Sequence, residues 1–516
     1  MKVLTKHLVL MVWLGFALAG VACGSGGSNS SPPPPPPPPG GNFANASLKG
    51  QYAFSMSGRE LCGGFGSFFA RVGTFTADGN GNIKDGLEDV NACAGVGTLQ
   101  FSNGKYSISS DGRGTLSLTN STGTTNYSIT LSSTAQGFIA QTDVNATASG
   151  SFQRQNPAAF SNPAIAGGYV FDFNGVDFAS SAGNPASIIG RFDANGAGGI
   201  SNGLFDSNIG GTLSGQRSFP AGAFYQVDSN SNGSTFGRGT ANIAGHDFAF
   251  YVVDATTVKF LGTGFPSALV GDAIAQQNVS FQIASLNGSY AFLIGGSSSS
   301  GPIATAGRFT ADGRGNITNV VLDENNSGGI TLLTNGTVTG SYSVDANQLG
   351  GGTLIWTDSK VPGSFSFIFY LSSPTEAVFQ EIDPGITSDG SLSAQTTTPI
   401  SPASLAGNYA FGWSGASSDE EDFVGQLSLT AASSNNFIGS MDFNQFGPGK
   451  QFFNVPINGS LTLSGDGTQA NTYIVNLQTI PANKFSFTAY VVNQNTLFLV
   501  GVDNTRVIAG SSALQH

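Results

Sequence analysis

The sequence predicts an all-β protein built from four tandem copies of one antiparallel unit. Residues 73–83 read Gly-Thr-Phe-Thr-Ala-Asp-Gly-Asn-Gly-Asn-Ile, and this segment returns almost unchanged at residues 307–317. A looser copy occupies residues 190–200 and a diverged copy begins at Gly425, so the copies start 117, 117 and 118 residues apart. The chain also has 73 glycines in 516 residues. Glycine destabilises helix interiors but serves tight turns, which favours a turn-rich sheet protein.

The composition limits the classes of partner. Charged residues make up 10% of the chain and hydrophobic residues 39%, so much of the surface must consist of Ser, Thr, Asn and Gly. The formal net charge is −12. Nucleic acid and anionic lipid headgroups both attract basic surfaces, so this charge argues against either as a partner. Phe outnumbers Trp by 40 to 3, which indicates several cores filled in the same way.

The N-terminus predicts export and a lipid anchor. Residues 1–22 form an expected signal peptide, with two lysines before an apolar run of 12 residues, Leu8–Ala19, that is too short to span a bilayer. The small residues before Cys23 resemble the bacterial lipobox, although Gly20 stands where that pattern prefers leucine. The resemblance implies lipidation of Cys23 and, because Gly24 is not acidic, attachment to the outer membrane. The alternative is ordinary cleavage upstream, which leaves a secreted protein with a free thiol.

Residues 23–45 are a predicted disordered stalk. Their first part is rich in Gly, Ser and Asn, and residues 32–39 are an unbroken run of eight prolines. Such a run forms a stiff polyproline II rod about 25 Å long, at about 3.1 Å per residue. A flexible foot followed by a rod would lift folded units off a membrane.

Four predicted units follow the stalk. Each unit opens with Gly-x-Tyr-x-Phe and closes with Gly-x-x-x-x-Gln. The opening tyrosines are Tyr52, Tyr169, Tyr290 and Tyr409, and the closing glutamines are Gln155, Gln276, Gln395 and Gln515. We therefore expect units at residues 46–155, 164–277, 285–396 and 404–516.

Within a unit we expect about eight short strands joined by hairpins. In the first unit they lie near residues 51–57, 68–77, 82–90, 97–101, 105–109, 114–119, 126–131 and 137–142, with 150–155 as a ninth strand or a replacement. Apolar and polar residues alternate from Tyr52 to Ser57, which is typical of a half-buried strand. The pairs Asp78-Gly79, Asn103-Gly104 and Asp111-Gly112 are typical of primed hairpin turns.

Strands joined by tight hairpins predict that each unit is an eight-stranded up-and-down β-barrel, because closure removes the sheet edges. The alternative is a β-sandwich of the immunoglobulin kind, which needs longer crossovers. The opening Gly-x-Tyr-x-Phe resembles the Gly-x-Trp start of lipocalins and avidins, and this resemblance implies a barrel. The whole tandem pattern resembles the repeats of predicted lipoproteins in acidobacteria-like bacteria, which implies no particular chemistry.

The first repeated turn invites a calcium interpretation. Asp78, Asn80 and Asn82 place oxygen-bearing side chains at alternate positions, as EF-hand loops do. The spacing fails, because Ile83 occupies the sixth position, where glycine is required. We interpret the segment as a hairpin turn and expect no metal site.

Cys62 and Cys93 are the cysteines that remain in the folded region if Cys23 carries lipid. An even pair in an exported protein predicts a disulfide, and the alternative is two buried thiols. Closing a loop of this size contributes about 3–4 kcal/mol in the chain-entropy model.

No catalytic or cofactor-binding set is evident, and we expect a protein that is not an enzyme. His246 is the one histidine outside the signal and the C-terminal residue, and its place before a strand indicates a turn or surface role. Asp143, Asp383 and Asp503 follow strands, and turn formation explains them as well as a hydrolase with paired carboxylates would.

Three further charged features are interpreted as surface. Arg113 and Arg238 recur at one turn in the first two units, and we expect exposed hairpin arginines because the other units lack them. The acidic run at residues 419–422 is expected to be a solvated loop.

These observations predict an exported envelope protein, anchored to the membrane by its lipid, that acts as a binding or structural surface module. Its partner would be polysaccharide or another envelope component. The alternative is a carrier of small apolar ligands inside the barrels, and a hydrolase is the third candidate. No cofactor and no nucleic-acid partner are expected.

Overall fold

The computed structural model describes residues 42–180, 183–229, 233–277, 280–333, 338–358, 361–396, 400–430, 436–447, 450–464, 469–477 and 484–516. Across these ranges the chain is all-β and forms one antiparallel sheet per repeat. Helical segments in these ranges are short 3-10 turns: η1 (Asn45–Ser47), η2 (Pro157–Ala159), η3 (Asn162–Ala164), η4 (Ser234–Phe236), η5 (Ile283–Ser285) and η6 (Pro402–Leu405). No described helix has the length and apolar character to cross a membrane. The predicted signal peptide and Cys23 lie outside the described residues.

The first and third sheets share one topology. The first contains β1 (Lys49–Cys62), β2 (Phe65–Asp78), β3 (Asn82–Ala92), β4 (Gly95–Phe101), β5 (Asn103–Ile108), β6 (Arg113–Asn120), β7 (Gly123–Leu131), β8 (Gln136–Gln141) and β9 (Ala146–Arg154). The third contains β20 (Asn287–Ser298), β21 (Gly301–Asp312), β22 (Asn316–Asn326), β23 (Gly329–Leu333), β24 (Val338–Val344), β25 (Gly351–Asp358), β26 (Val361–Ser373), β27 (Glu376–Glu381) and β28 (Ile386–Ala394). In each, the last strand pairs with the first, and an added β2–β3 or β21–β22 pairing closes the sheet on itself.

The other two sheets differ in how they close. The second contains β10 (Ala166–Asp177), β11 (Asn184–Asn195), β12 (Ile200–Ile209), β13 (Thr212–Leu213), β14 (Arg217–Ser218), β15 (Phe224–Val227), β16 (Arg238–Ile243), β17 (His246–Val252), β18 (Thr257–Gly262) and β19 (Ser267–Ala275). A bridge between Gly199 and Phe224 spans its opening. The fourth is a closed barrel of β29 (Gly407–Ala416), β30 (Glu420–Leu429), β31 (Asn436–Gln445), β32 (Gln451–Leu463), β33 (Gln469–Leu477), β34 (Lys484–Asn493), β35 (Thr496–Gly501) and β36 (Val507–Leu514).

The structure confirms the all-β class and the four antiparallel tandem units, and it excludes the sandwich, because each unit is one continuous sheet. The strands expected in the first unit are all present. The predicted turn at Asn103-Gly104 is wrong, since both residues lie in β5.

Residues 42–45, assigned to the stalk, instead lie against the first barrel, where Asn45 Oδ1 accepts a hydrogen bond from the Ile108 backbone at 2.8 Å.

Aromatic side chains fill each barrel. In the first, the rings of Tyr52 and Phe75 stack at 5.6 Å between centroids, and Phe152 meets the Tyr52 ring edge-on at 5.8 Å. All three are fully buried. A void in the second barrel measures only about 10 Å³. Each of the four units has its own cluster of buried apolar side chains, so the many phenylalanines fill the barrel interiors.

The glycine that opens each closing motif allows strands to approach. A Cβ atom at Gly150 would collide with the carbonyl oxygen of Ser55 on β1, and one at Gly271 would collide with that of Asp172 on β10. Only glycine tolerates this approach, so the first and last strands of these barrels can pair tightly.

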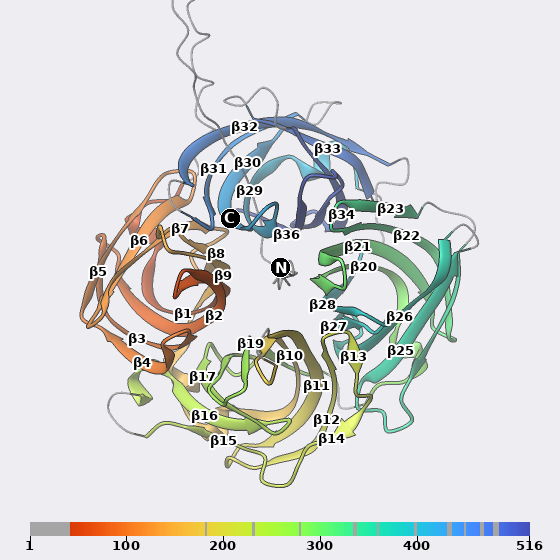
Figure 1. The fold of residues 1–516 in the computed structure, drawn as a ribbon, viewed down its shortest axis with the longest axis horizontal. Helices are drawn as coiled ribbons and strands as arrows, with labels where there is room; N and C mark the ends of the chain where they lie inside the picture. Colours follow the sequence, from red (N-terminus) through yellow and green to blue (C-terminus); the bar gives the residue numbers. More distant parts are fainter. Residues whose placement is uncertain are drawn as a thin grey trace, which may run out of the picture.

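The four barrels stand in a closed ring around a central axis (Figure 1). Buried apolar side chains from both partners form each junction, and the fourth barrel contacts the first as well as the third. At the first junction Val72 packs with Tyr251 and Leu261, and at the last Phe138 packs with Ala410 and Val424.

The closing glutamine of each unit joins that unit to the next. The side-chain amide nitrogens of Gln155, Gln276, Gln395 and Gln515, which we call the latch glutamines, donate to backbone carbonyl oxygens of the following barrel at 2.6–3.0 Å. Gln515 reaches back to the first barrel, at Asp111 and Leu131. The recurring Gln thus closes the ring.

A second repeated contact crosses the same junctions. Asn91, Asn208, Asn325 and Asn444 donate from Nδ2 to backbone carbonyls of the next barrel. Two residues before each asparagine stands an aspartate, and at three junctions it accepts from a tyrosine of the next barrel, in the pairs Tyr251–Asp89, Tyr370–Asp206 and Tyr490–Asp323. At the fourth junction Thr130 replaces the tyrosine, and Asp442 instead lies 4.0 Å from Arg113.

These junctions correct two expectations about surface charge. Arg238 is not an exposed hairpin arginine, because it forms an ion pair with Asp89 of the first barrel at 2.8 Å. Arg113 likewise donates to Asn454 of the fourth barrel at 3.0 Å. The acidic run is not a solvated loop either, since residues 420–422 belong to β30 and are buried, and Asp422 accepts from Thr147 of the first barrel at 2.9 Å.

Candidate functional site: a cavity at the centre of the ring

A cavity of about 450 Å³ lies where the four barrels meet around the central axis. Its lining comes from all four units, through β1, β8 and β9, β10 and β19, β20, β27 and β28, and β35 and β36. Figure 1 shows β9, β19, β28 and β36 at the inner side of the ring. Because side chains alternate along a strand, the residues next to the inward-pointing core aromatics face this cavity.

Corresponding positions around the cavity carry different residues in the four repeats, and of those named below Lys259, Gly412 and Ala509 do not line it. On the opening strand they are Ser55, Asp172, Leu293 and Gly412, and on the strand before the last they are Phe138, Lys259, Val378 and Phe498. On the last strand they are Ser151, Asp272, Ser391 and Ser511, preceded two residues earlier by Ser149, Val270, Asp389 and Ala509. The second barrel is thus charged where the others are neutral, and the third adds one acid.

The charged groups are tied to neighbouring barrels. Lys259 Nζ is fully buried and lies 2.9 Å from Asp272 Oδ2. The same nitrogen donates to Ser55 Oγ at 3.1 Å and Ser151 Oγ at 3.4 Å, both in the first barrel. Asn174 of the second barrel donates to Asp389 of the third at 2.9 Å. Contacts between neighbouring barrels therefore hold these charged side chains in place.

Two carboxyl groups that line the cavity, those of Asp172 and Asp389, resist ionisation. Burial raises the pKa of Asp172 well above its ordinary value, and the nearby carboxylates of Asp389 and Asp272 raise it further. Burial also raises the pKa of Asp389 to about 6, against hydrogen bonds from Ser187 and Asn174. Buried Oδ1 atoms of Asp172 and Asp272 have no hydrogen-bond partner among the described residues. Both atoms are enclosed by protein, so their missing partners mark an incompletely satisfied charged cluster beside the cavity.

The fourth barrel stands across the ring from the second (Figure 1). It contributes Phe498, Ser511 and Ala513 to the lining, and the third contributes Leu293 and Val378. The cavity therefore combines a charged, hydrogen-bonding side with a largely apolar remainder, which is the usual make-up of a small-molecule site.

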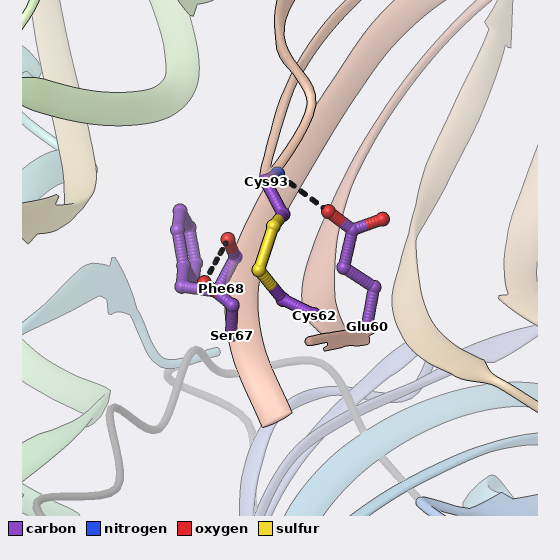
Figure 2. The surroundings of a disulfide bond; sticks show 5 residues. All are labelled: Glu60, Cys62, Ser67, Phe68 and Cys93. Atoms are coloured by element: carbon purple, nitrogen blue, oxygen red, sulfur yellow. Dashed lines mark hydrogen bonds between the residues drawn. A yellow bond between two sulfur atoms is a disulfide. The ribbon is translucent and has the colours of Figure 1, made fainter. Parts of the chain in front are cut away.

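The predicted disulfide lies away from this cavity. Cys62 and Cys93 form a disulfide in the structure, with Cα atoms 5.9 Å apart, and Figure 2 shows it between the ends of β1 and β3. Glu60 accepts a hydrogen bond from the Cys93 backbone at 2.6 Å beside it. The bond ties together two long hairpins of the first barrel.

The residues weighed for metal and acid chemistry serve turns. Asp78 accepts from the backbones of Asn80 and Asn82 and from the Asn82 side chain, and these bonds lower the pKa of Asp78 to about 2. Asp143 accepts from Asn126, and Asp503 accepts from the Thr505 backbone. Within the described ranges, no group of three or more His, Cys, Asp or Glu side chains is arranged to hold a metal ion.

Sequence reasoning missed Asp172, Asp272 and Asp389, which line the cavity, and Lys259, which is buried against Asp272. A position-by-position comparison of the repeats would have found them, because each is charged on a strand where the other copies are neutral. Their convergence depends on the ring, which the sequence alone does not show.

Comparison with known proteins adds little about this site. No protein-family model and no curated protein matches the chain. Similar solved structures include transferrin binding protein B of Neisseria meningitidis, at 9% identity over 73% of this chain and 84% of that chain with a TM-score of 0.19, and a variant of the Haemophilus parasuis protein, at 10% identity over 74% and 84% with a TM-score of 0.20. A protein of unknown function from the DUF3598 family of Nostoc punctiforme shares 9% identity over 45% of this chain and 98% of its own, with a TM-score of 0.16. TM-scores this low indicate no shared overall arrangement. The barrel architecture is instead established by the strand pairings of this chain.

Proposed function

We propose that this protein is a lipid-anchored binding module of the cell envelope that holds its ligand in the central cavity of the ring. The observation that carries the proposal is the concentration of charge at cavity-facing positions of the second and third repeats. At equivalent positions the first and fourth repeats are neutral. A structural ring would need no such difference, whereas a ligand site does.

The chemistry of the wall defines the ligand class. Three carboxyl groups, those of Asp172, Asp272 and Asp389, line the cavity, and the ammonium of Lys259 is fully buried against Asp272. The complement is a small ligand with hydrogen-bond donors or a positive charge at one end and an apolar part at the other. A cavity of about 450 Å³ suits a molecule of a few hundred daltons.

The filled barrels argue against the alternative of apolar ligands carried inside each unit. A carrier barrel needs an open interior, and here stacked aromatic rings occupy that space, as Phe367 and Phe379 do at 4.6 Å between centroids. Anchoring through Cys23 and residence at the outer membrane remain part of the proposal, on the strength of the signal sequence.

A hydrolase is the second candidate, because one observation favours it. Asp172, whose pKa is raised, shares the cavity with Asp272, which is ion-paired to Lys259. A pair of carboxyl groups in one cavity is the arrangement that many hydrolases use for acid and base catalysis. Turnover of a bound ligand that stops in Asp172→Asn would favour this candidate over simple binding.

Native mass spectrometry of residues 42–516 from the native host tests the proposal. We expect one adduct of a few hundred daltons per chain, lost in the double variant Asp172→Asn with Asp272→Asn. The control is Asp247→Asn, which removes an exposed acid of the same barrel. Bare wild-type protein, or an adduct that survives the double variant, would reject the central cavity as the site.

A further inference from the structure

A second depression lies on the outer surface, where the first and fourth barrels meet. It has a volume of about 530 Å³ and is lined by β5, β6 and β7 of the first barrel and by Phe453 on β32 of the fourth. This is the one junction of the ring that no connector of the chain spans, because it joins the last unit to the first. We call this depression the seam groove.

The floor of the seam groove is a grid of polar side chains. Strand register places Lys105 opposite Ser117 and Ser117 opposite Asn126 in one row. It places Ser107 opposite Thr115 and Thr115 opposite Ser128 in the next. Neighbouring strands are about 4.8 Å apart and the rows about 7 Å apart, so the floor offers regularly spaced hydrogen-bonding groups.

Several of these groups are held in position but keep capacity for a ligand. The Ser107 and Thr115 hydroxyls lie 2.9 Å apart, and Lys105 Nζ uses one donor on Asn82 at 2.6 Å. Ser128 is fully buried at the edge of the groove, whereas the side chains of Lys105, Ser107, Thr115 and Asn126 are exposed. A ligand would therefore form its hydrogen bonds with these exposed groups.

Phe453 forms the apolar side of the seam groove. Its side chain is 50% exposed, while the adjacent Phe452 packs against the barrel core. The neighbouring Asn454 accepts a hydrogen bond from Arg113 of the first barrel at 3.0 Å, which fixes this strand beside the groove. The negative face of an aromatic ring attracts weakly positive C–H groups, such as those on the flat face of a sugar.

We propose that the seam groove binds a segment of a neutral polysaccharide. Hydroxyls and an amide on the floor match sugar hydroxyls, and the phenyl ring matches a sugar face. No carboxylate belongs to the lining, and Lys105 is its one charged group. A peptide strand fits less well, because the closed barrel presents no free edge for it to pair with. This second site is independent of the central cavity.

Affinity electrophoresis in gels that contain a neutral polysaccharide tests the proposal, with glucans of β-1,4, β-1,3 and α-1,4 linkage and a mannan as the panel. Isothermal titration with the matching hexasaccharide then measures affinity. We expect retardation by at least one polymer, and at least tenfold weaker binding in Phe453→Ala and in the double variant Ser107→Ala with Thr115→Ala. Phe453→Tyr should keep most of the affinity.

A matched control comes from the third barrel. Ser343 and Thr353 form the same hydroxyl pair there, also 2.9 Å apart. The double variant Ser343→Ala with Thr353→Ala should bind like wild type, and so should the central variant Asp172→Asn. Absence of retardation by every polymer, or binding that Phe453→Ala leaves unchanged, would overturn the proposal. Far-UV circular dichroism confirms that each variant keeps its sheet content.

Discussion

Gln515 donates from Nε2 to the backbone carbonyl oxygen of Leu131 at 2.8 Å, across 384 positions of sequence. With its second bond to Asp111, it fastens the end of the fourth barrel to the first. The same contact joins every other pair of neighbours, so one repeated residue turns a linear array into a ring.

Removal of the last latch should loosen the ring at its unlinked junction. In Gln515→Ala, two backbone carbonyls of the first barrel lose their donor, which we expect to cost about 1–3 kcal/mol. Hydrogen exchange should rise around Asp111 and Leu131. Gln276→Ala is the comparison, since a connector also holds its junction, and it should open less. Equal protection in both variants would show that the latches act alike.

Stability should fall as the pH rises through neutrality. Burial raises the pKa of Asp422 to about 7, and it also raises that of Glu420, where Asp422 adds repulsion and Arg59 opposes it. Because the folded pKa lies above the unfolded one, the native state binds more protons in between. The contribution of Asp422 to the free energy of unfolding is therefore full below its unfolded pKa near 3.9 and is lost as the pH passes about 7.

Thermal unfolding at pH 5 and pH 8 measures this effect. Wild type should melt lower at pH 8. Asp422→Asn should narrow the difference, because Asn keeps a hydrogen-bonding group beside Thr147 without the ionisation. If Asp422→Asn keeps the wild-type difference between pH 5 and pH 8, other acids control the pH dependence of stability, such as Glu381, whose pKa is about 8.

The hydroxyl groups of the tyrosines at the barrel junctions should stabilise the protein in addition to the packing of their rings. In Tyr370→Phe the carboxylate of Asp206 loses its 2.8 Å hydrogen bond while it stays buried. We expect a loss of about 1–3 kcal/mol in the free energy of urea unfolding. Tyr342→Phe, which removes a hydroxyl bonded to backbone inside the same unit, separates the junction effect from general hydroxyl loss.

The disulfide should stabilise the first barrel in particular. The double variant Cys62→Ser with Cys93→Ser should lower the free energy of unfolding by about 3–4 kcal/mol in the chain-entropy model. Hydrogen exchange should rise in the β1–β2 hairpin. Alkylation of the non-reduced protein checks the bond itself, and labelling of both cysteines would contradict it.

Strand pattern carried most of the fold prediction. The alternation of apolar and polar residues around Tyr52 and the turn at Asp78-Gly79 depend on neighbours in sequence, so both can be predicted without the structure. Asn103-Gly104 misled because a turn-forming pair can also lie in a strand when close packing requires glycine, and here a Cβ at Gly104 would meet the Ser117 carbonyl.

Charged residues were the least predictable. Arg238 and Asp422 looked like surface because their partners, Asp89 and Thr147, belong to other repeats. Local sequence carries no sign of such contacts. Repetition was the signal of these contacts in the sequence, because the Asp-x-Asn pair that lies at each junction recurs at residues 89–91, 206–208, 323–325 and 442–444.

The sequence by itself determined the four antiparallel units, their turns and the signal-like N-terminus, because period, glycine placement and hydropathy act over a few residues. Only the tertiary structure decided that the units close into a ring, that Gln515 completes it, and that Asp172, Asp272 and Asp389 line one cavity. The physical reason is that these contacts form between surfaces of whole barrels. The Gln515 contacts span 384 and 404 positions of sequence, so their partners converge only after the first and last barrels have folded.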